Sequence, residues 1–282
     1  MKLSSSQKNN LDNLNKGYEG ERRFFELLEE ELIAECVPLY GLQFEVNQTE
    51  FQIDSLLIFQ NTLDIFEIKN YDDDYYIEGE KWHAVSGKEI RNPTHQLKRC
   101  EILFRQLLQQ LGYNFPVNSY LVFVNPEFYL YQAPFNQSVI FPTQLLRLTK
   151  KLNSMGGKIT QRHMKLANQL ALRHIPMSAH ERIPEYSYED LKKGIVCTSC
   201  RGFLSVINNE RLKCSKCGNE DSMESAIMRS VAEFHLLFPN RKITISAISE
   251  WCLINTKKTL RRILMKNMKC VRKGRFSYYT FI

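Results

Sequence analysis

The sequence predicts an α/β protein with a mixed sheet, followed by two small modules, and three observations support this prediction. In residues 1–175, segments with helical spacing of apolar residues alternate with short β-branched and aromatic segments. Four later cysteines form two closely spaced pairs, and residues 241–282 are strongly basic. A chain of 282 residues is too long for one small domain, so we expect two or three.

The α/β part is expected to occupy residues 1–175. After a frayed polar arm of about a dozen residues, the periodicity predicts a helix over residues 17–35. Strands are expected over 39–46, 51–59 and 63–69, short strands over 75–85, and a helix over 94–111 that Pro93 opens. Strands over 119–124 and 138–141 and two helices between 143 and 173 complete the list. This order of elements indicates a mixed sheet.

The composition argues against a membrane or secreted protein. No segment approaches the roughly 20 consecutive apolar residues that a membrane span requires. The first residues, Met-Lys-Leu-Ser-Ser-Ser-Gln, lack the apolar core of a secretory signal. We therefore expect a cytoplasmic protein, in whose reducing environment the eight cysteines favour metal ligands or buried thiols over disulfides.

The charge is distributed unevenly along the chain. The net charge of +7 combines residues 1–190, with 20 basic and 25 acidic side chains, and residues 191–282, with 18 basic and 6 acidic side chains. This asymmetry indicates a C-terminal part that binds a polyanion, attached to a part with another role. A solvated basic surface without a partner is the alternative.

Charged residues interrupt two of the predicted strands. Asp54 lies within 51–59, and Glu67 and Lys69 lie on one face of 63–69. Because buried charges are costly when unpaired, a divalent cation would explain why two carboxylates converge. Mg²⁺ is typically bound by one or two carboxylates, and a neighbouring lysine can stabilise charge on a phosphoryl group or help position water. Two ordinary ion pairs on a half-exposed sheet are the alternative.

Five sequence elements in order resemble the nuclease-related domain (NERD) family. They are Gly17-x-x-Gly20-Glu21, Ile53-Asp54-x-Leu-Leu-Ile, Glu67-Ile68-Lys69-Asn70, Trp82 and Asn92-Pro93-x-x-Gln96. The family is part of the PD-(D/E)xK phosphodiesterase superfamily, with a restriction-endonuclease-like mixed sheet flanked by helices. The resemblance covers residues 17–124 and implies a nuclease that uses Mg²⁺ or Mn²⁺. It implies metal ligands Asp54 and Glu67, a contribution from Glu21 directly or through water, a catalytic Lys69, and Gln96 as a polar group at the same site.

The sequence departs from the family pattern at two points. No proline precedes Asp54, and Tyr71-Asp72-Asp73-Asp74 replaces the usual glycine-rich turn after the lysine strand. The favoured interpretation is that these aspartates face solvent on a loop. Their charge also motivates an alternative function, a catalytically inactive NERD-fold regulator or sensor that binds DNA.

A cysteine module follows a linker predicted over residues 176–193. Cys197-x-x-Cys200 and Cys214-x-x-Cys217 have the spacing of two metal-binding turns, and residues 194–220 resemble a zinc ribbon. Four protein ligands leave no open position, so the expected Zn²⁺ is structural. A redox role is the weaker alternative. The other four cysteines (Cys36, Cys100, Cys252 and Cys270) are expected to be core thiols.

Residues 221–282 are expected to form a helix and a DNA-binding module. A helix over 222–238, a strand over 243–245, a helix capped by Ser246, a helix from Thr256 to Asn267 and a hairpin resemble a winged helix-turn-helix. The expected DNA contacts are Lys257, Lys258, Arg261 and Arg262 on the second helix and Arg272, Lys273 and Arg275 on the wing. A helical interaction domain with a solvated positive face is the alternative.

Taken together, these features predict a metal-dependent nuclease that hydrolyses phosphodiester bonds in DNA and is recruited by its basic C-terminal module. RNA as the substrate and an oligomeric protein are both compatible with the sequence.

Overall fold

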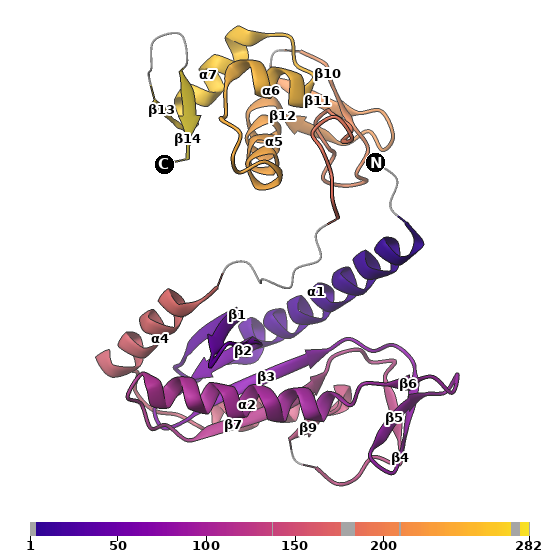
Figure 1. Cartoon of the computed structure of the whole chain (residues 1–282), viewed down its shortest axis with the longest axis vertical. Coiled ribbons are helices and arrows are strands. Elements are labelled where there is room, and N and C mark those ends of the chain that lie inside the picture. The colour runs from indigo at the N-terminus through magenta and orange to yellow at the C-terminus, as the bar shows by residue number, and fades with distance from the viewer. Residues whose placement is uncertain (1–3, 137, 176–183, 209, 272–276, 282) are drawn as a thin grey trace. The chain divides into compact units, whose positions relative to one another are not determined.

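The computed structural model of the chain describes residues 4–136, 138–175, 184–208, 210–271 and 277–281. The chain divides into two compact units, Lys2–Pro184 and Glu185–Ile282 (Figure 1). Among the described residues, no helix combines the length and the apolar character needed to cross a bilayer.

The N-terminal unit is built on a five-stranded mixed sheet with the strand order β1-β2-β3-β7-β9. The strands are β1 (Val37–Val46), β2 (Thr49–Ile58), β3 (Leu63–Lys69), β7 (Val117–Phe123) and β9 (Val139–Ile140). The first three pair antiparallel, whereas β7 pairs parallel with β3 and β9 pairs parallel with β7. The predicted mixed sheet is therefore confirmed.

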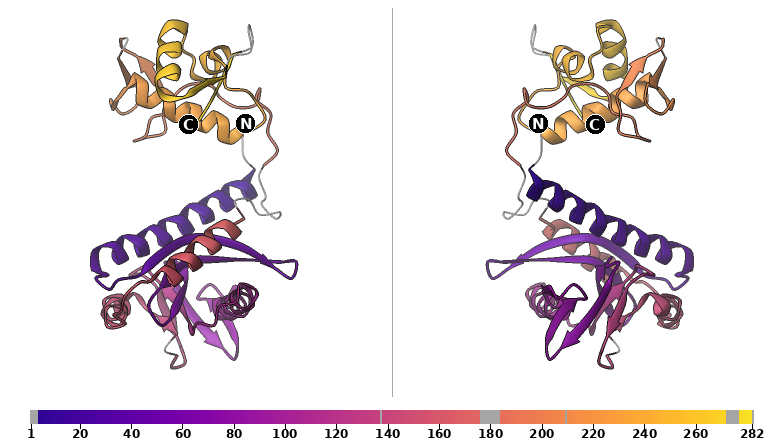
Figure 2. Two further views of the ribbon diagram at one scale, coloured as in Figure 1. Left: turned by 90° about the vertical axis from the view of Figure 1, so that its left-hand side faces the viewer. Right: turned by 90° about the vertical axis from the view of Figure 1, so that its right-hand side faces the viewer.

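Helices cover both faces of this sheet. They are α1 (Ser5–Glu31), α2 (Pro93–Gln110), α3 (Leu145–Asn153) and α4 (Gln161–Arg173), with a short 3₁₀ turn at Pro142–Gln144. Phe24 of α1 and Leu148 of α3 belong to one apolar core, and Phe104 of α2 and Leu166 of α4 belong to another. Figure 2 shows α1 and α2 on opposite sides of the sheet. The architecture is the sheet flanked by helices that the resemblance implied.

Helix α1 begins much earlier than the sequence analysis predicted. The expected frayed arm is helical from Ser5, because Ser4 and Gln7 form a capping box. The Gln7 backbone N–H donates to Ser4 Oγ at 3.2 Å, and the Ser4 N–H donates to Gln7 Oε1 at 2.8 Å. The prediction was wrong here because the Ser-x-x-Gln signal outweighs the polar composition of this segment.

A second, four-stranded sheet follows β3 and has the order β6-β5-β4-β8. Its strands are β4 (Asp74–Glu78), β5 (Lys81–Ala84), β6 (Glu89–Ile90) and β8 (Tyr129–Tyr131). Trp82 and Leu130 on its inner face pack with Phe123 of β7 in one apolar cluster. The small sheet therefore lies at the end of the large sheet where β3 and β7 finish (Figure 1).

The C-terminal unit combines a cysteine-containing sheet with a helical group. Its elements are β10 (Leu204–Val206), β11 (Arg211–Cys214), β12 (Glu220–Ser222), α5 (Met223–Leu237), α6 (Ile245–Cys252), α7 (Lys257–Asn267), β13 (Lys269–Val271) and β14 (Tyr278–Thr280). One apolar core contains Cys197 and Cys214 together with Phe234, Trp251 and Leu264. The two modules that the sequence separates thus share a core.

Two boundaries in the C-terminal unit differ in detail from the sequence analysis. Thr244, not Ser246, caps α6, because its Oγ1 accepts a hydrogen bond from the Ala247 N–H at 3.1 Å. Ile243 consequently forms an isolated bridge with Tyr279 instead of a strand over 243–245. Within the predicted linker, residues 176–183 lie outside the described residues, and Tyr188 is buried in the core of the C-terminal unit.

Candidate active site

Asp54 occupies a bend in the β1–β2 hairpin. Gly41, which lies opposite Asp54 in the register, has a φ of +59°, a conformation that favours glycine. Ile53 and Leu56 are three residues apart and yet contact the same core, whereas strict strand alternation would place them on opposite faces. The bend therefore changes the direction of the side chains at Asp54.

The Asp54 carboxylate is buried and bonded to the neighbouring strand. Its Oδ2 accepts a hydrogen bond from the Ile68 backbone N–H at 2.8 Å, and its Oδ1 accepts one from the Gln52 side-chain amide at 3.2 Å. Burial raises the pKa of Asp54, although the Ile68 hydrogen bond opposes the shift. Each carboxylate oxygen keeps a further lone pair that a cation can use.

Lys69 is held between a carboxylate and an amide. Its Nζ donates to Glu67 Oε1 at 2.6 Å and to Gln96 Oε1 at 3.2 Å. Burial lowers the pKa of Lys69, but the surrounding negative charges, led by Glu67, outweigh this effect and the net pKa is raised. The lysine is consequently a fixed ammonium group at neutral pH.

The start of α2 explains the position of Gln96. The Asn92 side-chain oxygen accepts a hydrogen bond from the Thr94 N–H at 2.9 Å, and Pro93 is the first residue of the helix. The Asn92 side-chain amide also donates to the Glu80 carbonyl at 3.2 Å, which ties the helix start to the β4–β5 turn. Asn-Pro-x-x-Gln is thus a helix cap that directs the Gln96 side chain to Lys69.

Helix α1 approaches the end of β3 through Gly20. A Cβ at Gly20 would lie 2.6 Å from Asn70 Cβ, so only glycine permits this contact. The Asn70 side-chain amide donates to the Lys16 carbonyl at 2.8 Å and accepts from the Asn125 side chain at 3.2 Å. A Cβ added at Gly17, the other glycine of the predicted element, would meet no atom of the described residues within 4 Å, so Gly20 is the one that the packing requires.

This contact places Glu21 in the electrostatic surroundings of Asp54 and Glu67. Burial and then the Asp54 charge raise the pKa of Glu21 to about 7. Burial, followed by the charges of Asp54 and Glu21, raises the pKa of Glu67 to about 7, although Lys69 opposes the shift. The three carboxylates disfavour each other's ionised forms, and a cation among them would relieve this repulsion.

The donor set fits a hard divalent cation, because it consists of carboxylate oxygens. The oxygens are less tightly grouped than the four cysteine sulfurs, which form the metal-ligand group found within 4.8 Å among the described residues. One oxygen of Glu67 is bonded to Lys69. Glu67 would therefore offer its other oxygen to a cation.

Two of the three aspartates after β3 face solvent on a loop, as the favoured interpretation expected, whereas Asp74 is half-buried and begins β4. Asp72 and Asp73 are exposed, and Asp72 forms an ion pair with Lys16 of α1. Asp73 Oδ1 accepts a hydrogen bond from the Asp74 N–H at 2.8 Å.

Sequence reasoning missed Gln52. Its side chain lies two residues before Asp54 and bonds to it, so strand alternation was the signal that would have found it. Cys100, expected as a core thiol, is buried and its Sγ donates to the Gln52 carbonyl at 3.2 Å. Burial, followed by the charges of Glu67 and Asp54, raises the pKa of this thiol. Cys100 is therefore an uncharged neighbour of the carboxylates.

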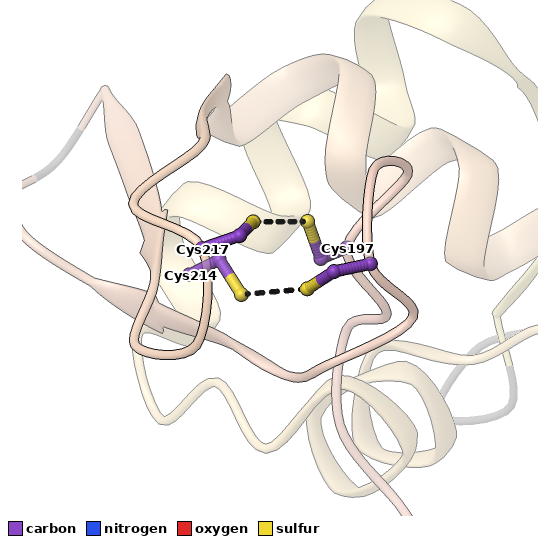
Figure 3. A group of neighbouring side chains, drawn as sticks. Cys197, Cys214 and Cys217 are labelled. Atoms are coloured by element: carbon purple, nitrogen blue, oxygen red, sulfur yellow. Dashed lines mark hydrogen bonds between the residues drawn. The ribbon is translucent and has the colours of Figure 1, made fainter.

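The four cysteines of the C-terminal unit converge as the spacing predicted. Cys197, Cys200, Cys214 and Cys217 place their sulfurs within 4.8 Å of one another, with 3.7 Å between Cys197 and Cys217 (Figure 3). Gly202 packs closely against this cluster, because a Cβ there would lie 3.3 Å from the sulfurs of Cys200 and Cys214. Four convergent thiols on two turns fit a zinc ribbon.

The basic face of α7 is exposed. Lys257, Lys258, Arg261 and Arg262 point away from the core, whereas Leu260, Ile263 and Leu264 are buried. Lys266 on the same helix forms an ion pair with Glu224 of α5 at 2.9 Å. The predicted wing residues Arg272, Lys273 and Arg275 lie outside the described residues.

Comparison with known proteins gives one family match. Residues 16–124 match the family model of the nuclease-related domain, NERD. No curated protein and no solved structure matches the chain. The matched segment supplies Glu21, Asp54, Glu67, Lys69 and Gln96. The similarity to the nuclease-related domain family therefore covers residues 16–124 of the N-terminal unit.

Proposed function

We propose that the chain is a metal-dependent nuclease that hydrolyses phosphodiester bonds in DNA. The observation that supports this most directly is the grouping of Asp54, Glu67 and Lys69 at the end of β3, with Lys69 held by Glu67 and Gln96. A structural Zn²⁺ at the four cysteines is part of the same proposal. The family match supports the class of chemistry.

Asp54 and Glu67 would hold a catalytic Mg²⁺ or Mn²⁺, with Glu21 contributing directly or through water. When bound, such an ion supplies Lewis-acid stabilisation of negative charge on a phosphoryl group. Glu21 and Glu67, with pKa values raised to about 7, are partly protonated at neutral pH without a cation. Protons therefore compete with metal binding.

Lys69 would stabilise the charge that develops on the phosphate oxygens. Its ammonium group keeps donor capacity beyond its bonds to Glu67 and Gln96, because an ammonium carries three protons. These two partners fix the lysine before substrate arrives, so little reorganisation is needed during the reaction.

The test of this function is cleavage by the purified full-length chain. Plasmid, linear duplex and single-stranded DNA and RNA are incubated with and without Mg²⁺ or Mn²⁺, and the products are separated on gels. We expect cleavage of DNA only with an added ion. Omission of the ion is preferable to a chelator, because a chelator would also remove Zn²⁺ from thiolates. DNA binding without cleavage under every condition would favour the catalytically inactive regulator instead.

We further propose that the C-terminal unit binds DNA as a winged helix-turn-helix. The order α5, α6, α7 and the β13–β14 hairpin, closed by the Ile243–Tyr279 bridge, supports this arrangement. Helix α7 would enter the major groove, and Arg272, Lys273 and Arg275 would contact phosphates from the wing.

Replacing Lys258 and Arg261 with alanine is expected to weaken DNA binding uniformly across sequences. Each lost phosphate contact should reduce the slope of log K against log salt by about 1. Fluorescence anisotropy at several salt concentrations measures both quantities. Lys266→Ala is the matched control, because its ammonium is already paired with Glu224. Equal losses in the control and the double variant would contradict the proposed interface.

A further inference from the structure

The outer face of the small sheet carries a row of aromatic rings. Tyr76 of β4 pairs with Tyr131 of β8 on one side and with His83 of β5 on the other. Paired residues in a ladder point to the same face, and Tyr129 joins them because it precedes Tyr131 by two residues. Trp82, one residue from His83, belongs to the inner apolar cluster. The row therefore points away from the core.

These rings present flat surfaces to solvent. Tyr129 is 57% exposed and Tyr131 is 48% exposed, and their ring centroids are 4.6 Å apart. Tyr76 is half-buried and stacks on His83 with a centroid distance of 5.0 Å and an interplanar angle of 16°. Both ring nitrogens of His83 are covered and lack a hydrogen-bond partner within the described part of the chain. His83 therefore supports Tyr76 from the side, and the three tyrosines are the accessible rings.

The charge around this row argues against a ligand bound through its phosphates. Residues 70–92 contain six acidic and three basic side chains. One of the three basic side chains, Lys81, is already paired with Glu89. Such a surface repels the phosphates of a duplex and of a single strand alike, but a duplex also hides its base faces. Exposed rings instead favour a ligand with accessible π faces, and unpaired bases are such a ligand.

The aromatic row is connected directly to the candidate active site. Tyr76 of β4 lies seven residues after Lys69, which limits the separation of their Cα atoms to about 25 Å. Tyr71 in this connection stacks on Tyr75 of β4 with a centroid distance of 5.0 Å, so the connection is packed. A few nucleotides of an extended strand bridge such a distance.

We propose that Tyr76, Tyr129 and Tyr131 form a stacking platform for unpaired bases, which holds single-stranded nucleic acid beside Lys69. The inference rests on the proposed nuclease function for calling the bound strand a substrate. Since every base has a π face, the platform would bind single strands with little sequence preference.

The test uses the full-length chain without added Mg²⁺ and a single-stranded oligonucleotide containing 2-aminopurine, whose fluorescence is quenched by stacking. The variant Tyr76→Leu/Tyr131→Leu removes two rings, and Tyr76→Phe/Tyr131→Phe is the matched control that keeps them. We expect quenching with the native chain and the phenylalanine variant. The leucine variant should lose the quenching and bind the single strand about 10-fold or more weakly, with an unchanged salt slope.

Two results would overturn the platform. The first is equal quenching by the leucine and phenylalanine variants. The second is loss of self-association in the leucine variant, measured by sedimentation, because the rings would then bind a second copy of the chain. If the double leucine variant does not fold, Tyr129→Leu, at the most exposed ring, serves in its place. Failure of the nuclease proposal can be distinguished from failure of the platform proposal. A native chain that quenches 2-aminopurine but never cleaves would retain the platform and lose the hydrolytic function.

Discussion

Replacing Lys69 or Asp54 with alanine is expected to reduce metal-dependent cleavage by about 100-fold or more, with DNA affinity nearly unchanged. Lys69→Ala removes the fixed ammonium group, and Asp54→Ala removes a carboxylate that the Ile68 N–H orients. DNA affinity should persist because the basic face of α7 lies in the other unit. Single-turnover cleavage of labelled DNA and anisotropy without metal measure the two quantities.

Matched controls for these variants lie in the same unit. Lys81→Ala and Asp73→Ala remove exposed charges of the same type that do not contact the site. Gln96→Ala removes only one hydrogen bond to Lys69, so it should cause a smaller loss of rate. Circular dichroism checks that Lys69→Ala still folds, since the variant leaves Glu67 buried without its partner. Native cleavage rates in both Lys69→Ala and Asp54→Ala would remove the assignment of the site.

Loss of Zn²⁺ is expected to unfold the whole C-terminal unit and abolish its DNA binding. Cys197 and Cys214 belong to the same core as Trp251, and the Gly194 N–H donates to the Trp251 carbonyl at 2.7 Å. Apparent binding energies of structural zinc are about 10–16 kcal/mol in small peptides, which matches or exceeds the roughly 5–15 kcal/mol stability of a whole domain. We therefore expect the helices to depend on the bound metal for their stability.

The tryptophans make this result measurable. The chain has two, Trp82 in the N-terminal unit and Trp251 in the C-terminal unit, so a Trp82→Phe background isolates the emission of Trp251. Elemental analysis should find one Zn²⁺ per chain before chelation, and Cys214→Ser should mimic its removal. Cys270→Ser is the control, because this thiol lies in the same unit outside the cluster. Unchanged Trp251 emission in metal-free protein would contradict the expectation.

Local patterns in the sequence were enough to predict many of the elements. Strand alternation placed Glu67 and Lys69 on one face, and the antiparallel neighbour brought Asp54 to them. Pro93 correctly marked the start of α2, and the spacing of the cysteines predicted their cluster. These features depend on contacts between residues that are close in sequence or in adjacent strands.

Other features depend on packing that no local pattern encodes. The need for glycine at Gly20 comes from Asn70, and the conformation of Gly41 matters because it bends the hairpin at Asp54. The common core of the cysteine loops and the helices likewise joins segments that the sequence shows only as separate modules. Such contacts between distant residues determine how helices, strands and loops pack together. Composition and periodicity do not predict them.

The hydrogen bonds of Asn70 have a consequence for the order of folding. This side chain bonds to Lys16 and Asn125, which are 54 and 55 residues away along the chain. Contacts at such separations form only after long loops have closed, a step that is entropically costly and slow. We therefore expect the carboxylate of Glu21 to reach its neighbours late in folding, when most of the unit has already assembled. For the proposed nuclease, a nascent or partly unfolded chain would then lack activity, which would limit damage to nucleic acids during synthesis.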